Sequence, residues 1–155
     1  MSLERRVSAI ADLTARAGTR PRVLCLEWLD PYYVGGHWVP EMVAKAGGED
    51  VLGRAGDTSF RVTAAQIAQS RPDVIVVMPC GYSARRVAAE FGLSQMPAEW
   101  KDLPAVRSRQ IFAVDANSYF SRPGPRLADG VALLAHIFHS ELCAEEAPSG
   151  AYRRL

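Results

Sequence analysis

Short apolar runs that predict buried strands alternate with helical patterns along this chain of 155 residues. The clearest run is Val74 to Met78, whose five residues are apolar and mostly β-branched and precede the turn Pro79-Cys80-Gly81. Three more strands are expected at residues 23–26, 50–52 and 111–114. Because strands separated by helices indicate βαβ units, we predict an α/β fold: a single three-layer lobe with a mainly parallel, roughly four-stranded sheet and helices on both faces.

The expected helices are marked by apolar stripes and capping residues. Apolar residues recur at helical spacing from Leu3 to Ala17, and this stripe must cover either the sheet or a part of the protein that is absent. Thr63 and Gln66 fit the capping box of a helix that runs to about Ser70. Further helices are expected from about residues 40, 82 and 127, followed by a frayed, polar tail. We therefore divide the chain into a helix over 1–18, a lobe over 19–140 and a tail over 141–155.

Composition limits the kinds of partner. With 48% hydrophobic and 23% charged residues, the chain fits one globular domain with a real core. The net charge of +1 gives no electrostatic reason to expect nucleic acid or an anionic membrane as a partner. No apolar core of a secretion signal is visible at the N-terminus, so either the protein stays inside the cell or a leader has been removed.

Three loops should meet at one edge of the sheet, because ligands gather outside the carboxyl ends of parallel strands. These loops cover residues 27–38, 79–82 and 115–126, and each is richer in Gly, Pro, aromatic or polar residues than a short connector requires. The first loop carries Trp28, Tyr32, Tyr33 and Trp38 within eleven residues. Each ring could simply pack under the loop, but four together favour a binding surface.

Catalytic and metal-binding patterns are weak. Cys80 lies between a strand and a helix, where amide groups could lower its thiol pKa, and His37, Asp115 or His139 could act as its base. Packing at a tight turn is the more common role of such a cysteine. His37 could bind a metal axially, and His136 and His139 could share one, yet no third ligand lies at ligand spacing. We therefore expect no catalytic residues, no metal site and no resident cofactor.

Three segments carry a resemblance to a known family. They read LEWLDPYYVGGHWVPEMVAKAGGEDVLG, RPDVIVVMPCG and WKDLPAVRSRQIFAVDANSYFSRPGPRLADGVALLAHIFH. From about Arg22 to His139 the chain resembles the C-terminal lobe of the substrate-binding proteins of cobalamin and iron-siderophore ABC importers, most of all the cobalamin group. The helix from Leu3 to Ala17 is similar to the end of the backbone helix that joins the two lobes. The resemblance implies half of an extracytoplasmic receptor, periplasmic or membrane-anchored, whose N-terminal lobe is missing from this chain.

The resemblance also implies a ligand and the residues that hold it. Family members grip a corrin between the lobes with aromatic side chains and a few polar contacts, without a covalent step. The ligand would be cobalamin, another corrinoid or a related metal chelate such as a siderophore complex. Rings can bury a flat macrocycle, and an arginine can donate to its amide side chains or a phosphate. The implied ligand-binding residues are Trp28, Tyr32, His37, Trp38, Tyr82, Tyr119, Phe120 and Arg122.

The resemblance also bears on protein partners. Family receptors present an acidic residue to the ABC permease at the start of the helix after Val62, where this sequence has Ala65, so docking to a permease is in doubt. The exposed loops of a lone lobe would favour a homodimer. Two other hypotheses stay open: a small intracellular α/β enzyme that uses Cys80 as a reactive thiol, and an interaction module in which the stripe of the first helix docks onto a missing lobe.

Overall fold

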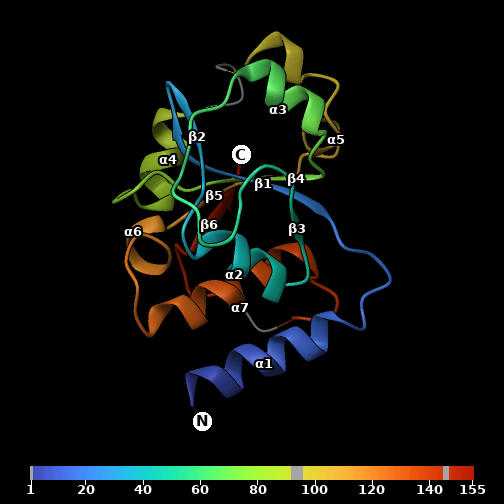
Figure 1. The fold of residues 1–155 in the computed structure, drawn as a ribbon, viewed down its shortest axis with the longest axis vertical. Coiled ribbons are helices and arrows are strands. Elements are labelled where there is room, and N and C mark those ends of the chain that lie inside the picture. Colours follow the sequence, from blue (N-terminus) through green and yellow to red (C-terminus); the bar gives the residue numbers. More distant parts are fainter. Residues whose placement is uncertain (1, 92–95, 145–146) are drawn as a thin grey trace.

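One six-stranded sheet runs through the part of the chain that the computed structural model describes, residues 2–91, 96–144 and 147–155 (Figure 1). The strands are β1 (Arg22–Leu29), β2 (Tyr32–Val34), β3 (Glu49–Asp50), β4 (Val74–Val77), β5 (Ile111–Val114) and β6 (Tyr152–Arg154). Their order is β2-β1-β4-β5-β6, and β3 pairs with the start of β1. Strands β3, β1, β4 and β5 are parallel neighbours, while β2 and β6 are antiparallel edge strands.

Each of the four predicted strands has a counterpart in the parallel part of the sheet, although β3 spans Glu49–Asp50 rather than residues 50–52. The predicted strand number is too low, because β2 and β6 are edge strands of only three residues, too short to stand out as a local pattern. The expectation of a frayed tail is wrong for residues 152–154, which pair with β5. The guanidinium carbon of Arg154 lies 5.3 Å from the centroid of the Phe112 ring, and the Tyr152 hydroxyl lies 3.2 Å from Nε2 of His136. Polar residues suit such an edge strand, because charged side chains block pairing with other chains.

Helices cover both faces of the sheet, as predicted. One face carries α1 (Leu3–Thr14), α2 (Val39–Lys45), α6 (Ala116–Tyr119) and α7 (Arg126–Phe138). The other carries α3 (Ala64–Ser70), α4 (Ala84–Glu90), the 3-10 helix η2 (Ala98–Trp100) and α5 (Pro104–Arg107). Figure 1 shows α2, α7 and α1 on one side of the sheet and α3 and α5 on the other. The side chains of β4 alternate between two cores, with Val74 and Val76 in the first and Ile75 and Val77 in the second.

Part of the apolar stripe of α1 is covered by this chain itself. Val7 and Ile10 pack against the core beneath α7 and α2, and Arg6 forms a 2.7 Å ion pair with Asp129 of α7. The helix ends at Thr14 rather than near Ala17. The middle of the stripe therefore already has a packing partner in this chain, while Leu3 at its start is exposed.

Two helix starts mark where loops that follow the strands end. The capping box of α3 is confirmed, since the Thr63 side chain accepts from the Gln66 amide and the Gln66 side chain accepts from the Thr63 amide. Helix α4 begins at Ala84 after the N-cap Ser83, two residues later than predicted. This later start leaves Tyr82 in the loop. In the described ranges, no helix has the length and apolar character needed to cross a bilayer.

Candidate functional site

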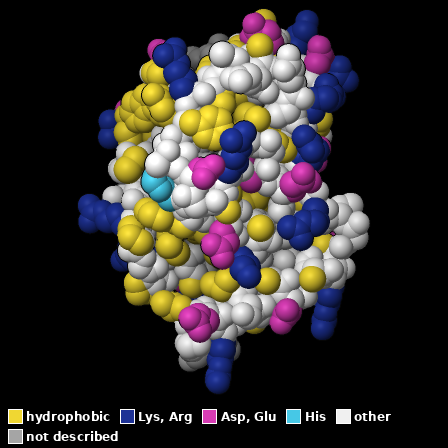
Figure 2. All heavy atoms as spheres, in the orientation of Figure 1, with side chains coloured by type: hydrophobic (Ala, Val, Ile, Leu, Met, Phe, Trp, Pro, Cys, Tyr) yellow, Lys and Arg dark blue, Asp and Glu magenta, His cyan; other side chains and the backbone are white. Residues whose placement is uncertain are grey.

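The three predicted loops meet at the carboxyl ends of the parallel strands. The rings of Trp28 and Tyr82 pack edge to face with centroids 5.7 Å apart. The Gly81 amide donates to Ser121 Oγ at 3.2 Å, and Nε1 of Trp38 donates to the Phe120 carbonyl oxygen at 2.9 Å. Each loop thus touches at least one of the others. Hydrophobic side chains gather on the side of the molecule where β2, α4 and α6 lie (Figure 2).

We call the surface formed by Trp28, His37, Tyr82, Ser121 and Arg122 the rim. Trp28 is 36% exposed, and its indole N–H donates to the Asp30 carbonyl oxygen at 3.2 Å. His37 and Arg122 are also exposed, and Tyr82 is half-buried. The rim residues therefore bring aromatic faces and cationic or neutral donors to one edge of the sheet, a combination that suits a flat, partly apolar ligand with polar substituents.

The segment predicted as a loop over residues 27–38 is largely a β-hairpin. Strand β1 continues to Leu29, and Trp28 pairs with Tyr33 and Leu29 with Tyr32. Because neighbouring side chains of a strand point to opposite faces, Trp28 faces the rim while Leu29 and Tyr32 pack into the core beneath α3 and α5. The hairpin holds the Trp28 indole more firmly than an irregular loop would.

Tyr82 is held on several sides. Its ring lies 6.4 Å from that of Phe91 and 5.7 Å from that of Trp28. The guanidinium carbon of Arg86 lies 3.6 Å from the Tyr82 centroid, and Nε of Arg86 donates to Glu90 Oε1 at 3.0 Å. No pattern in the sequence singles out Arg86, since its role depends on α4 starting after Tyr82. This cation–π contact orients the Tyr82 ring toward Trp28.

The backbone at His37 is fixed by a loop from elsewhere in the chain. His37 has a φ of 56°, its amide donates to the Asp57 carbonyl oxygen at 2.6 Å, and its own carbonyl accepts from the Gly56 amide at 3.0 Å. The imidazole lies 5.5 Å from the Trp38 ring. Within the described residues, no group of three or more His, Cys, Asp or Glu side chains is placed to hold a metal ion. His37 could contribute at most a single axial bond to a metal that arrives in a chelate.

Four of the predicted ligand contacts lie elsewhere or face inward. Phe120 is 4% exposed and packs in the core beneath α7, and Tyr119 lines a groove between α1 and α7. Tyr32 packs against Trp100, and Trp38 packs against the core with its indole N–H bonded to Phe120. Phe120 is therefore not placed to contact a ligand as predicted, because its ring has almost no free surface in this structure.

The inward turn of residues 119 and 120 has a local cause. Asp115 caps α6 by accepting from the Ser118 amide at 3.0 Å and from the Ser118 hydroxyl at 2.7 Å. The single turn of helix directs the following residues toward α7. There Gly130 permits close packing, because a Cβ at this position would lie 2.8 Å from the Tyr119 carbonyl oxygen and 3.2 Å from the Phe120 ring.

The three bases proposed for Cys80 have other roles or positions. Both carboxylate oxygens of Asp115 cap α6, and His139 is buried with Nε2 3.0 Å from the Gly47 carbonyl oxygen. His37 is hydrogen-bonded through its backbone to residues 56 and 57. Cys80 itself is exposed in the loop after β4. Nothing in this arrangement favours the alternative of a thiol enzyme.

Comparison with known proteins identifies the family. A sequence model described as periplasmic binding protein matches residues 2–118, about three quarters of the chain. The chain belongs to this family of extracytoplasmic ligand-binding proteins. A search of curated proteins finds no match.

Solved structures agree with this assignment. The periplasmic heme-binding protein RhuT from Roseiflexus sp. RS-1 is 27% identical, with a TM-score of 0.71 over 89% of this chain and 53% of that one. The vitamin B12 binding protein BtuF of Vibrio cholerae is 21% identical, with a TM-score of 0.68 over 92% and 52%. An Fe3+-hydroxamate transport protein from Saccharomonospora viridis DSM 43017 is 21% identical, with a TM-score of 0.70 over 88% and 47%. The chain thus spans about half the length of these structures, and the predicted resemblance to one lobe of such a receptor is confirmed.

Proposed function

We propose that this chain binds a corrinoid, or a related flat metal chelate, at the rim as one lobe of an ABC importer substrate-binding protein, and that it does not transform the ligand. The observation that carries the proposal is the edge-to-face pair of Trp28 and Tyr82, which joins two loops far apart in sequence on an exposed part of the sheet edge. The family assignment supports a binding role, and the names of RhuT and BtuF support a tetrapyrrole-like ligand.

Each rim residue would make a different kind of contact with the ligand. Trp28 offers a large apolar surface that a macrocycle can cover, and Tyr82 supports it from the side. Arg122 can donate to the amide side chains or phosphate of a corrinoid, and equally to the carboxylates of heme. His37 offers an imidazole to the metal of the chelate. Heme is therefore the alternative ligand of the same class.

The partners of the lobe are part of the proposal. A counterpart lobe would supply the other side of the cleft outside the cytoplasm, so this chain alone should bind weakly or pair with a second copy through its exposed surface. Ala65 lies exposed in the first turn of α3, where relatives would present a carboxylate to a permease. Without that carboxylate, docking through this position should be weak.

The direct experiment is a titration of the protein with cyanocobalamin, hemin and ferrichrome, followed by ligand absorbance and tryptophan fluorescence. We expect saturable binding of cyanocobalamin in the high micromolar range. If hemin binds more tightly than cyanocobalamin, the rim remains the proposed site and heme becomes the proposed ligand. The absence of a saturable response to all three compounds would contradict the proposal.

Rim variants connect the binding to the site. Trp28→Ala should weaken binding by about tenfold or more, because aromatic residues at the centre of a binding surface contribute most to affinity. Trp28→Phe should retain most of it. Arg122→Gln should cost several-fold, whereas the matched control Arg16→Gln, an exposed residue before the amino end of β1, should change nothing. Equal affinities for the parent protein and Trp28→Ala would place the ligand elsewhere.

A further inference from the structure

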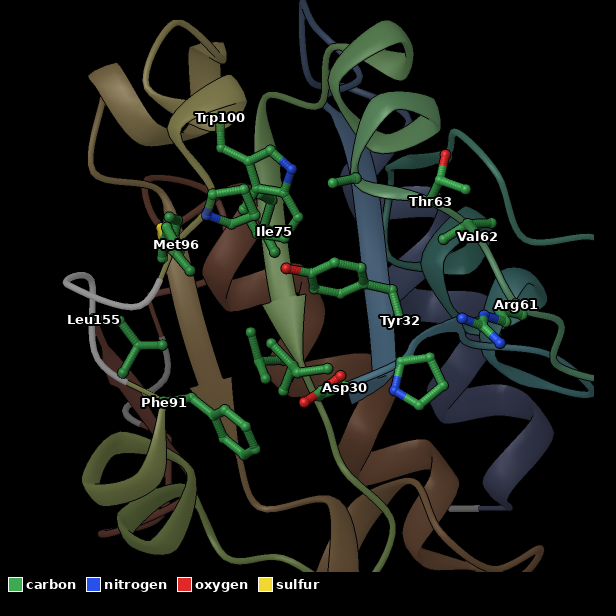
Figure 3. Close-up of a pocket in the computed structure, with 16 residues that line it drawn as sticks. Asp30, Tyr32, Arg61, Val62, Thr63, Ile75, Phe91, Met96, Trp100 and Leu155 are labelled. Atoms are coloured by element: carbon green, nitrogen blue, oxygen red, sulfur yellow. The ribbon is translucent and has the colours of Figure 1, made fainter.

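A cavity of 510 Å³ lies on the face of the sheet opposite α2 and α7 (Figure 3). Ile75 and Val77 form its floor, the β1–β2 hairpin contributes Asp30 and Tyr32, and Trp100 closes one wall. None of the rim residues lines it. Its volume is within the usual range of small-molecule pockets, and its lining is mostly apolar with a few polar groups, as is typical of such sites.

Two polar groups in this cavity have no hydrogen-bond partner among the residues that the structure describes. Trp100 is 2% exposed, and its indole Nε1 has no hydrogen-bond partner among the described residues. A buried donor left unpaired is energetically costly, so such groups are rare in folded proteins. In the same part of the chain, no residue bonds to the Tyr32 hydroxyl, which points into the cavity in Figure 3.

The two rings act as one wall. The centroids of Tyr32 and Trp100 lie 5.3 Å apart, and Figure 3 shows the nitrogen-bearing edge of Trp100 directed toward the side of the cavity that holds Thr63. The Trp100 nitrogen is closed to water, so an acceptor can reach it only when this wall opens slightly. The Tyr32 hydroxyl is the more accessible group and would make the first contact.

The surrounding charges indicate what kind of ligand fits. Burial raises the pKa of Tyr32, and the negative charges of Asp30 and Glu99 raise it further. The same charges would repel an anion beside the hydroxyl. Arg61 also lines the cavity. A neutral acceptor thus fits beside the Tyr32 hydroxyl better than an anionic one.

We propose that this cavity is a second binding site, separate from the rim, for a small, neutral and mostly apolar molecule that carries a carbonyl-type acceptor. The acceptor bonds to the Tyr32 hydroxyl and, once the wall opens, to the Trp100 indole N–H. The apolar body covers Ile75 and Val77. This site does not depend on the ligand of the rim.

Acetophenone and ethylbenzene are a suitable pair of probes, because they have similar shapes and only the first carries a carbonyl oxygen. The readout is the proton–nitrogen correlation NMR spectrum, in which Trp28, Trp38 and Trp100 each give an indole signal. Loss of one signal in Trp100→Phe assigns it. We expect acetophenone, at up to about 10 mM, to shift the Trp100 signal saturably and to leave the Trp28 signal in place.

The comparison of probes and variants tests the two parts of the proposal. Acetophenone should bind about three- to tenfold more tightly than ethylbenzene, since a net hydrogen bond contributes that much. Tyr32→Phe should reduce this preference, and Ala64→Leu, which fills the cavity from α3, should abolish the shift while the rest of the spectrum stays folded. Three results would overturn the proposal. The Trp100 signal does not shift saturably, the shift is retained in Ala64→Leu, or the two probes bind with equal affinity. Rim titrations report on Trp28 instead, so failure of one site is distinguishable from failure of the other.

Discussion

Gly36 fixes the backbone from which the rim is built. A Cβ at this position would clash with the amide nitrogen of Ser59 and lie 2.6 Å from the carbonyl carbon of Thr58. These are backbone atoms of the loop that holds His37. Gly36→Ala should therefore lower the free energy of unfolding by about 1–3 kcal/mol and move the loop away from the rim. Gly18→Ala, where a Cβ meets nothing within 4 Å, is the matched control in urea denaturation. Equal effects of the two substitutions would contradict this explanation.

Asp50 makes stability depend on pH. Burial raises its carboxyl pKa, against the opposing effect of hydrogen bonds from the Gly53 and Leu52 amides to Oδ1, and Oδ2 is buried without a partner among the described residues. The folded protein therefore holds this proton more tightly than the unfolded chain. The associated stability is present below the ordinary carboxyl pKa of about 4 and is lost as the pH rises through the raised value.

Asp50→Asn tests this directly, because the amide keeps the oxygen that accepts from Leu52 and Gly53. The difference in unfolding free energy between the variant and the parent protein should shift in favour of the variant as the pH increases from about 4 toward neutral. Urea denaturation at several pH values measures it. A difference that does not change with pH would show that Asp50 is not the titrating group.

Individual site residues could be predicted only where the adjoining strand determines their direction. Trp28 and Tyr82 follow apolar runs closely, so their place at the sheet edge could be read from the sequence. The inward position of Phe120 could not, because it depends on the cap at Asp115 and on the space at Gly130, ten residues further along the chain. Whether the four predicted residues on the rim contact a ligand stays a prediction.

Among the helices, α1 offers the clearest test of packing. Its stripe lies on α7 and α2, so Ile10→Asp should destabilise the fold by about 1–3 kcal/mol through loss of apolar contact and burial of a charge. Ser8→Asp, on the exposed side of the same helix, should have little effect. Thermal unfolding monitored by circular dichroism measures both. A stable Ile10→Asp protein with reduced self-association would instead support the interaction module.

Elements with a strong pattern were predictable, and elements formed by pairing were not. Strand β4 and the capped helix α3 carry their own signals in the sequence, a β-branched apolar run and a capping box. Strands β2 and β6 are three residues long and exist because β1 and β5 offer free edges. Such strands depend on tertiary contacts that a local pattern does not contain.

Across the whole fold, the order of the strands in the sheet determines where the rim forms. Placing β4 between β1 and β5 brings the loops after these strands to one edge, although they are separated by about fifty and forty residues of sequence. The α/β alternation predicted this edge. The particular contacts that join the loops, such as Gly81 to Ser121, are long-range and appear only in the structure.

Mapping cyanocobalamin on the protein by proton–nitrogen correlation NMR tests the rim most directly. We expect saturable shifts for the Trp28 indole and for the backbone amides of Tyr82 and Ser121, with little change at Gly18, beyond the opposite ends of the strands. Shifts confined to the Trp100 side of the sheet, or no saturable shift at the rim, would contradict the proposed binding site.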